Sequence, residues 1–391
     1  MKTSLCRICD SSSLEEIEEF TALHQVTSDC RPWSGGGHLV TCRSCGTVQK
    51  PHDERWVSDC RAIYSDYELY TQSSGIEQAV FEADSGMATT RSEQLLQRIA
   101  ECVSIPRSGQ LLDIGCGNGS FLRVFGSHAP QWKLWGSELH SRYRQEIEKI
   151  PGVERFHHGP AEELPGDFDW IVLLHVLEHV PNPVQYLDQL RSKLRTNGTL
   201  VIEVPHHIQN PFELTIADHA CHFSSVVLQR ILTRARYAVE SFADHWIPRE
   251  LSALARATDV RKSVGSPVEE ASAAASIVRS RVRWLADAAN LARQSADQAG
   301  CPIGVFGSSI AATWITTELD SSVAFFVDED PSRVGRTHLG HPILTPKRAP
   351  TDVPIYLALP RGQAETIALR LQTQNPSLNL ILPPEWNEEE P

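Results

Sequence analysis

The chain has 391 residues, 41% of them hydrophobic, so it can bury a large core and exceeds the size of one ordinary domain. Its 36 Lys and Arg against 49 Asp and Glu leave a net charge of −13, which repels nucleic acid and anionic membranes. The first residues lack the apolar core of a secretory signal, and no apolar run reaches about 18 residues. We therefore expect a cytoplasmic protein with no nucleic-acid or membrane partner.

Two C-x-x-C pairs stand near the amino terminus, separated by a loop rich in Gly and Ser: Cys6 with Cys9, and Cys42 with Cys45. Four thiolates at this spacing can surround Zn²⁺ tetrahedrally, and a closed four-sulfur site leaves no position for substrate. We predict a structural zinc module over residues 1–58, because so short a segment could hardly fold without a metal. Three residues of the loop are alternative ligands in principle: His24, Cys30 and His38.

Residues 59–100 are predicted to form a helical linker. Tyr64, Tyr67 and Tyr70 follow one another at i, i+3 and i+6, before the adjacent serines Ser73 and Ser74. This spacing places side chains on one face of a helix, so we expect Tyr64 and Tyr67 to be core aromatic residues.

Residues 111–122 join an apolar strand to a helix through three alternate glycines, Gly115, Gly117 and Gly119. Glycine accepts φ values that a Cβ resists, and free N–H groups where the helix opens, near Asn118, point at a ligand. The G-x-G-x-G spacing departs from the dinucleotide fingerprint, so a pyrophosphate is not the expected ligand. A second strand, residues 133–138, ends in Glu138, whose carboxylate can accept hydrogen bonds from both hydroxyls of a ribose.

Three more strands are predicted over residues 153–159, 168–176 and 199–205. The middle one is almost entirely apolar, as a parallel strand buried on both faces should be. Strands that alternate with helical patterns through about residue 245 predict a doubly wound α/β sheet. The glycine turn and residues 175–183, after the fourth strand, resemble the motifs of class I S-adenosylmethionine-dependent methyltransferases.

This resemblance implies S-adenosylmethionine as the cofactor. It places around the cofactor Asp113, Gly115, Cys116, Gly117, Gly119, Glu138, Ala161, Glu162 and His175. In the family an acid often follows the glycine after the third strand and binds the adenine amino group, but Pro160 stands there in this chain. Glu162 is the substitute, and the alternative is that it is an exposed acid without a role.

A histidine-rich segment, residues 215–224, follows the fifth strand. Imidazole titrates near neutrality, so a histidine that a neighbouring carboxylate orients can take a proton from a carbon next to a ketone. We predict His219 as this base and Asp218 as its orienting carboxylate, with His222 as the competing base. His179 or Tyr70 would stabilise the developing oxyanion. The structural alternative is that these histidines cap and solvate a helix that starts near Ser224.

Arg- and Ala-rich patterns predict helix over residues 249–300, with the charges on a solvated face. Residues 301–391 then begin with a strand, a turn and a helix, and the strand at residues 323–328 ends in Asp328, which predicts a second Rossmann-like domain. Its turn lacks the full glycine fingerprint, so a nicotinamide cofactor is not expected. The domain either closes the cleft over a nucleotide-sugar or has a structural role.

The predicted parts follow one another along the chain in this order: the cysteine module, the Tyr/Ser segment, a methyltransferase core (101–258), a helical connector (259–300) and a Rossmann-like domain. It resembles bacterial sugar C-methyltransferases, which act on nucleotide-linked keto-deoxysugars. The resemblance implies proton abstraction next to the ketone and in-line methyl transfer. It matches Tyr70 to a tyrosine near the substrate and Asp218–His219 to an acid–histidine pair, but Ile216 stands where the family has a second tyrosine. Two alternatives are an O-methyltransferase acting on a glycan, sugar or natural product, and an inactive cofactor-binding protein.

Overall fold

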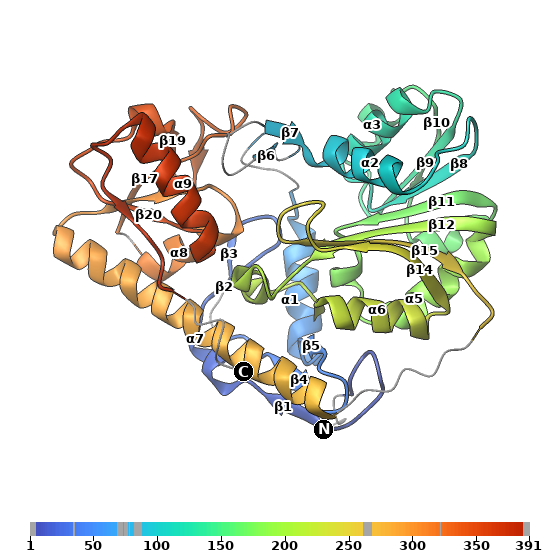
Figure 1. Ribbon diagram of the computed structural model, residues 1–391, viewed down its shortest axis with the longest axis horizontal. Coiled ribbons are helices and arrows are strands. Elements are labelled where there is room, and N and C mark those ends of the chain that lie inside the picture. The colour runs from blue at the N-terminus through green and yellow to red at the C-terminus, as the bar shows by residue number, and fades with distance from the viewer. Residues whose placement is uncertain are drawn as a thin grey trace.

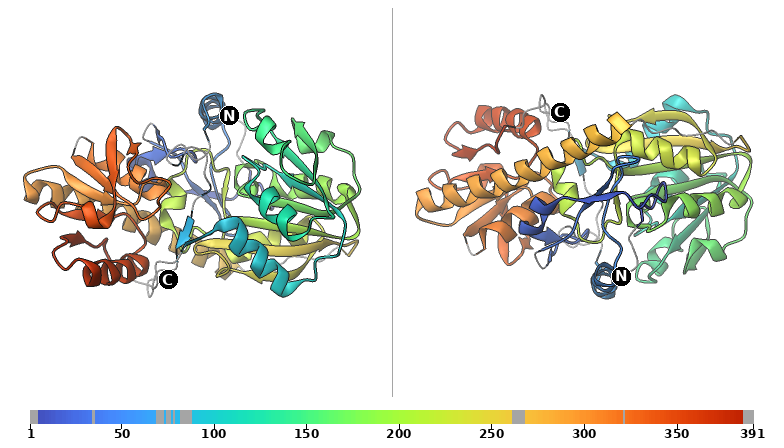
Figure 2. Two further views of the ribbon diagram at one scale, coloured as in Figure 1. Left: turned by 90° about the horizontal axis from the view of Figure 1, so that it is seen from above. Right: turned by 90° about the horizontal axis from the view of Figure 1, so that it is seen from below.

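The computed structural model describes residues 5–33, 36–68, 73, 77, 79–81, 88–260, 268–320 and 322–385. Figure 1 shows a large α/β domain and a smaller one, with the amino-terminal module below them and helix α7 (Val268–Ala299) running between the smaller domain and this module. Seen from above and from below, the two α/β domains lie on opposite sides of the amino-terminal residues (Figure 2).

The amino-terminal module shares a sheet with the large domain. Its elements are β1 (Leu14–Glu16), η1 (Glu18–Ala22), β2 (Gln25–Val26), β3 (Pro32–Trp33), β4 (Val40–Cys42), β5 (Val48–Gln49) and α1 (Glu54–Ser65). The order β1-β4-β5-β13 includes β13 (Cys221–His222), which comes from much later in the chain. β5 and β13 pair antiparallel, with Gln49 opposite Cys221 and Val48 opposite His222. The module is therefore joined directly to the histidine-rich segment.

The large domain contains a seven-stranded sheet in the order β10-β9-β8-β11-β12-β15-β14. Its strands are β8 (Gln110–Ile114), β9 (Lys133–Glu138), β10 (Val153–His158), β11 (Phe168–Leu174), β12 (Leu194–Pro205), β14 (Tyr237–Ala243) and β15 (Glu250–Ala257). β15 runs antiparallel to both of its neighbours, whereas the pairs from β10 to β12 are parallel. Two short strands, β6 (Ala79–Phe81) and β7 (Ala88–Thr90), precede this sheet in the chain and pair antiparallel with each other.

Helices cover both faces of the large sheet. They are α2 (Arg91–Cys102), α3 (Ser120–His128), α4 (Arg144–Ile147), α5 (Pro183–Leu190) and α6 (Ser225–Arg234), with the short turns η3 (Ala161–Glu163), η4 (Leu177–His179), η5 (Arg191–Lys193) and η6 (Pro211–Thr215). Val172 packs in one apolar cluster with α2 and α3, and its neighbour Ile171 packs in another with α5 and α6. Because successive strand residues point to opposite faces, this alternation confirms the predicted doubly wound α/β fold.

The helix prediction for residues 249–300 is wrong at its beginning. Glu250–Ala257 forms β15, which lies between β12 and β14 with Leu200 opposite Ala255. Leu251, Leu254 and Ala255 are almost completely buried there. Alanine favours helix by only a few tenths of a kcal/mol over other residues, and burial between two strands outweighs that preference.

The carboxy-terminal domain is a second α/β unit with a six-stranded sheet in the order β18-β19-β17-β16-β20-β21. It contains β16 (Ile303–Phe306), α8 (Ile310–Leu319), β17 (Val323–Val327), β18 (Thr337–His338), β19 (His341–Leu344), η7 (Pro346–Arg348), β20 (Ile355–Leu357), α9 (Arg361–Gln374) and β21 (Leu380–Ile381). β16 pairs parallel with β17 and with β20, as in a Rossmann-like sheet. Among the helices that the structure describes, none has the length and apolar character needed to span a bilayer.

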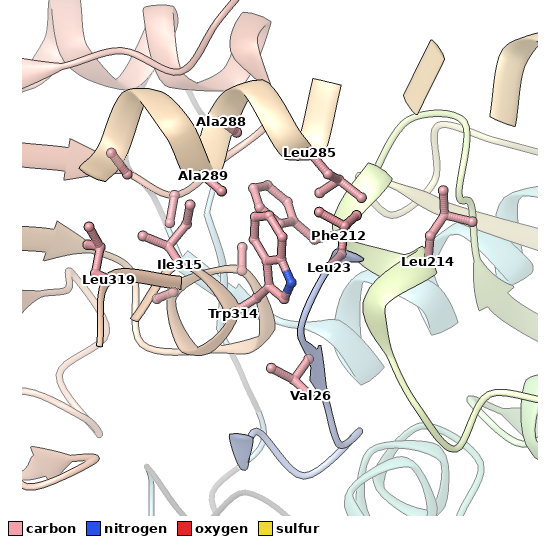
Figure 3. Packing of buried hydrophobic residues seen from close by; sticks show 14 of the residues in the cluster. Leu23, Val26, Phe212, Leu214, Leu285, Ala288, Ala289, Trp314, Ile315 and Leu319 are labelled. Carbon is pink, nitrogen blue, oxygen red and sulfur yellow. The ribbon is translucent and has the colours of Figure 1, made fainter. Parts of the chain in front are cut away.

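An apolar cluster joins the three parts of the molecule. Trp314 on α8 belongs to one cluster with Phe212 and Leu214 of η6, with Leu285 on α7 and with Val26 of the amino-terminal module (Figure 3). The ring centres of Phe212 and Trp314 are 5.7 Å apart. Two apolar side chains thus anchor η6 on either side of Glu213, the acidic residue between them.

Candidate active site

A cavity of about 780 Å³ lies where the three parts meet. The glycine turn and the ends of β9 and β11 form one wall, Ser28 and Tyr64 of the amino-terminal module another, and Ser308 and Asp328 of the carboxy-terminal domain a third. Ligand sites typically enclose about 300–1,000 Å³, so the volume suits small-molecule ligands.

The glycine turn lies at the carboxyl end of β8 and lines this cavity. Gly115, Gly117 and Gly119 have φ values of 68°, 53° and 80°, all in the left-handed region that favours glycine. A Cβ on Gly115 would lie 2.5 Å from Cγ2 of Val176, so no larger residue fits. Gly119 is the N-cap of α3. The N–H groups of Gly115 and Cys116 both donate to the Ser137 carbonyl, and that of Gly119 donates to the Cys116 carbonyl, so the free N–H groups expected from the sequence stay a prediction.

Glu138 ends β9 beside the turn, where the sequence predicts a ribose ligand. Its Oε2 accepts a hydrogen bond from the Gly117 N–H at 3.1 Å, and its Oε1 accepts one from the Leu139 N–H at 2.8 Å. Asp113 also lines the cavity but is buried. This burial raises the pKa of Asp113 well above its usual range, and the nearby charge of Glu138 adds to the effect. Glu138 is therefore the better candidate for holding ribose hydroxyls.

The remaining predicted cofactor contacts lie along the same wall. Cys116, Ala161, Glu162 and His175 all line the cavity. Glu162 is exposed, whereas Ala161 is buried on η3. The buried ammonium of Lys193 donates to the Glu162 carbonyl at 2.9 Å and holds this short helix in place.

His175 follows β11 in a left-handed conformation, with φ of 54°. Its Nδ1 lies 3.1 Å from Oε1 of the buried Glu178. Burial and the neighbouring Arg91 lower the pKa of His175, but nearby carboxylates outweigh them and raise it to about 10. These carboxylates belong to Glu178, Glu203 and Glu250. His175 is half-buried, and the raised pKa favours its protonated form.

Glu213 is the carboxylate that orients His219. Its Oε1 lies 2.5 Å from His219 Nδ1, both side chains are nearly inaccessible, and both residues line the cavity. Burial lowers the pKa of His219, but the charge of Glu213 outweighs this and holds it above the ordinary value. With Nδ1 bound to Glu213, Nε2 is the nitrogen left for a substrate proton.

The prediction that Asp218 orients His219 is wrong. Asp218 accepts hydrogen bonds from the N–H of Ser28 at 2.9 Å and from its hydroxyl at 2.5 Å. Its Oδ2 also lies 3.5 Å from Nδ1 of His179. Neighbouring positions in an irregular segment need not point the same way, so Asp218 faces the amino-terminal module while His219 faces Glu213.

His179 lies beside His219 as predicted, with ring centres 4.6 Å apart and planes almost perpendicular. Its Nδ1 is 2.9 Å from the hydroxyl of Tyr64 on α1. Burial, followed by the charge of His219, lowers the pKa of His179, so its imidazole is neutral. Tyr64, expected to be a core aromatic residue, instead reaches the cavity. Tyr70 lies outside the described residues.

His222, the competing base, lies on β13 and is fully buried. Its Nδ1 is 3.3 Å from Oε1 of Glu213. It is not among the residues that line the cavity, and burial lowers its pKa to about 4. His222 is therefore a neutral side chain that contacts Glu213 from outside the cavity.

The four cysteines of the C-x-x-C pairs converge, with their sulfur atoms all within 4.8 Å of one another. The Sγ atoms of Cys6 and Cys45 are 3.5 Å apart, and those of Cys9 and Cys42 are 3.6 Å apart, too far for disulfide bonds. The three alternative ligands do not join them: His24 pairs with Glu318, His38 pairs with Glu16, and Cys30 lines the cavity.

Sequence reasoning missed three residues of the site: Ser28, Tyr64 and Glu213. The one available signal was Glu213 itself, a lone acid between the apolar residues Phe212 and Leu214. An acid in such a run is buried at a cost unless it is paired, which makes it a candidate for function. Ser28 and Tyr64 belong to segments far from His219 in the sequence. No local pattern marks Ser28, and the tyrosine spacing that marks Tyr64 indicated a core residue.

Comparison with known proteins agrees with this geometry. Residues 87–241 match the protein family described as methyltransferase domain. This part of the chain is a class I S-adenosylmethionine-dependent methyltransferase domain. The match includes the glycine turn, Glu138, His175, His179 and His219, all of which belong to residues 87–241.

Relatives of the methyltransferase domain are similar over part of their length only. The tRNA U34 carboxymethyltransferase of Idiomarina loihiensis is 32% identical over 124 residues, 29% of this chain and 38% of that protein. The protein of that name from Shewanella piezotolerans is 35% identical over 120 residues, 29% of this chain and 36% of its own length. The chain thus spans well under half the length of these curated relatives.

Two solved methyltransferase structures are similar to part of this chain. N,N-8-amino-8-demethyl-D-riboflavin dimethyltransferase from Streptomyces davawensis covers 43% of this chain and 53% of its own, with 16% identity and a TM-score of 0.36. Mitomycin 7-O-methyltransferase covers the same shares, with 16% identity and a TM-score of 0.37.

Glu138→Ala is expected to weaken S-adenosylmethionine binding by about 10- to 100-fold, because a charge-assisted contact to the ribose is lost. Calorimetric titration of wild type and variant measures the change. Glu154→Ala, which removes an exposed acid paired with Lys133 on the neighbouring strands, is the matched control and should bind normally. Unchanged affinity in Glu138→Ala would remove Glu138 from the cofactor site.

Proposed function

We propose that the protein transfers a methyl group from S-adenosylmethionine to a carbon of a nucleotide-linked keto-deoxysugar. The observation that carries this proposal is the buried Glu213–His219 pair, with a contact of 2.5 Å, in the same cavity as the glycine turn. A histidine whose Nδ1 is held by a carboxylate keeps Nε2 free to act as a general base.

His219 takes the proton from the carbon next to the ketone at Nε2, and the electron pair of the broken C–H bond forms an enolate. Tyr64 and the neutral His179 lie beside His219, and because their own hydrogen bond uses one of their two protons, one of them is left to donate to the enolate oxygen. When bound, S-adenosylmethionine supplies the methyl group, whose bond to sulfur breaks as its bond to the carbon forms. The abstracted proton stays on Nε2 of His219, while Nδ1 keeps its contact with Glu213, and leaves to solvent after turnover.

The nucleotide-sugar is supported by the shape of the cavity, which continues from the methyltransferase domain to Ser308 and Asp328 of the carboxy-terminal domain. We propose that this domain closes the cleft over the substrate. A tRNA substrate, as in the names of the curated relatives, is disfavoured because the net charge of −13 repels polyphosphate chains.

O-methylation is the second candidate, because the same Glu213–His219 pair could deprotonate a hydroxyl group. Ile216, which stands where the sugar C-methyltransferases have a tyrosine, favours this alternative. The two reactions differ in the bond that forms, and the product distinguishes them.

The test is incubation with S-adenosylmethionine and a panel of nucleotide-linked keto-deoxysugars, followed by mass spectrometry and carbon NMR. A product with one additional methyl group on carbon is expected. A methoxy signal would instead establish the second candidate. Cofactor binding without product from any sugar nucleotide, glycan or natural product would indicate an inactive cofactor-binding protein.

Zinc is the metal proposed for the four cysteines. Zn–S bonds of about 2.3 Å in a tetrahedron place sulfur atoms about 3.8 Å apart. The observed 3.5 and 3.6 Å fit this geometry. Such a site needs reduced thiols, which supports a cytoplasmic location.

A further inference from the structure

The amino-terminal module holds the segment that carries the proposed base. The indole N–H of Trp56 donates to the Ala217 carbonyl at 2.9 Å. The backbone N–H of Lys50 donates to the Ala220 carbonyl at 3.0 Å, next to the point where β5 pairs with β13. His219 lies between these two contacts, so its backbone position depends on the module.

The side chain of Lys50 adds a contact beside Glu213, the other member of the Glu213–His219 pair. Only 1% of the residue is exposed. Its ammonium donates to the Leu214 carbonyl at 3.0 Å and lies 4.5 Å from the centre of the Phe20 ring. Leu214 directly follows Glu213, so this hydrogen bond holds the backbone beside the orienting carboxylate.

Two carboxylates face the Lys50 ammonium, those of Glu213 on η6 and of Asp218 after it. The Cys60 thiol on α1 lies near it as well, and burial raises the pKa of this thiol to about 12. Burial lowers the pKa of Lys50 to about 7, and the charges of Glu213 and Asp218 oppose that shift. On β13, burial and also the charge of Lys50 lower the pKa of His222. A buried cation is costly, and here it compensates carboxylates that would otherwise repel one another.

We propose that Lys50 is a positioning residue for the Glu213–His219 pair, fixing the backbone at Leu214 and balancing the buried carboxylates with a positive charge. The inference rests on the proposed function of His219. Removal of this cation should raise the pKa of His219, because the imidazolium loses a repelling neighbour. It should also slow turnover, since a misplaced catalytic group can cost up to about 100-fold.

The test is Lys50→Met, which keeps the apolar stem and removes both charge and donor. NMR titration of the His219 ring should show a raised pKa, the acid limb of the kcat profile should move to higher pH, and kcat should fall up to about 100-fold. Affinity for S-adenosylmethionine and the zinc content of about one per chain should not change. Lys133→Met, which removes an exposed lysine paired with Glu154, should leave the titration and the rate unchanged.

An unshifted His219 titration in folded Lys50→Met would overturn the inference, whatever the enzyme's substrate. If Lys50→Met does not fold, Lys50→Gln, which keeps a donor for the Leu214 carbonyl, is titrated instead and should show the same upward shift. The ring titration needs no turnover. A shifted pKa in a protein whose wild type methylates nothing would therefore refute the proposed function and still support the role of Lys50.

Discussion

His219→Asn is expected to lower the rate of methyl transfer by about 10²–10⁴, the usual contribution of one positioned general base. Asparagine approximates the shape of the imidazole and can still contact Glu213, but it cannot accept the substrate proton at neutral pH. Binding of S-adenosylmethionine should stay near normal, because the contacts expected to hold the cofactor come from the glycine turn and Glu138 and not from His219. Single-turnover kinetics with a sugar nucleotide and calorimetry with the cofactor measure the two effects separately.

His222→Asn is the matched control and should cost much less, because His222 is neutral and does not line the cavity. A second readout uses heavy water and an inert cofactor analogue. Wild type should exchange the proton beside the ketone, and His219→Asn should not. Full activity in His219→Asn would refute its assignment as the base, and a larger loss in His222→Asn would transfer the role to that residue.

Glu213→Gln is expected to lower kcat by about 10²–10⁴ as well, because the amide neither stabilises the imidazolium nor fixes the tautomer with Nε2 free. Burial lowers the pKa of His219 and Glu213 raises it, so removing the carboxylate must lower this pKa. A general base works only when unprotonated, and kcat therefore rises with pH through the His219 pKa. The acid limb of the kcat profile should consequently move to lower pH in Glu213→Gln.

Asp218→Asn is the comparison that separates the two carboxylates. Its partners are Ser28 and the edge of His179, so the variant should shift the His219 titration far less than Glu213→Gln does. Thermal melting of both variants checks that the fold survives, since breaking a buried ion pair can cost about 3–5 kcal/mol. A larger loss of activity and a larger titration shift in Asp218→Asn would restore Asp218 as the orienting group.

Much of the methyltransferase domain was predictable because its signals are local. The strand that ends in Glu138 and the alternate glycines of the turn depend on residues a few positions apart, and the structure matches both. The continuous apolar run of β11 likewise indicates a strand buried on both faces. β15 was not predicted because an Ala-rich run is compatible with both helix and strand. Its position between β12 and β14 makes it a strand.

The proposed base was predictable as a residue type but its surroundings were not. His219 stands out as a histidine after a core strand, and Asp218 is its nearest acid along the chain. The acid that contacts it, Glu213, comes from η6, whose path is set by the packing of Phe212 against Trp314 of another domain (Figure 3). Sequence adjacency cannot report a contact that depends on how three parts of a molecule pack.

The sequence by itself determined the α/β order, the glycine turn and the four thiols, because propensity, backbone freedom and short ligand spacing act between near neighbours. The tertiary structure alone decided that Glu213 orients His219, that Tyr64 reaches His179, and that Lys50 supports the pair from the amino-terminal module. These side chains meet because β5 adds to β13 and an apolar cluster joins the domains. The free energy that holds these side chains together comes from burying apolar surface between distant segments, and this outweighs the local conformational preferences of the chain.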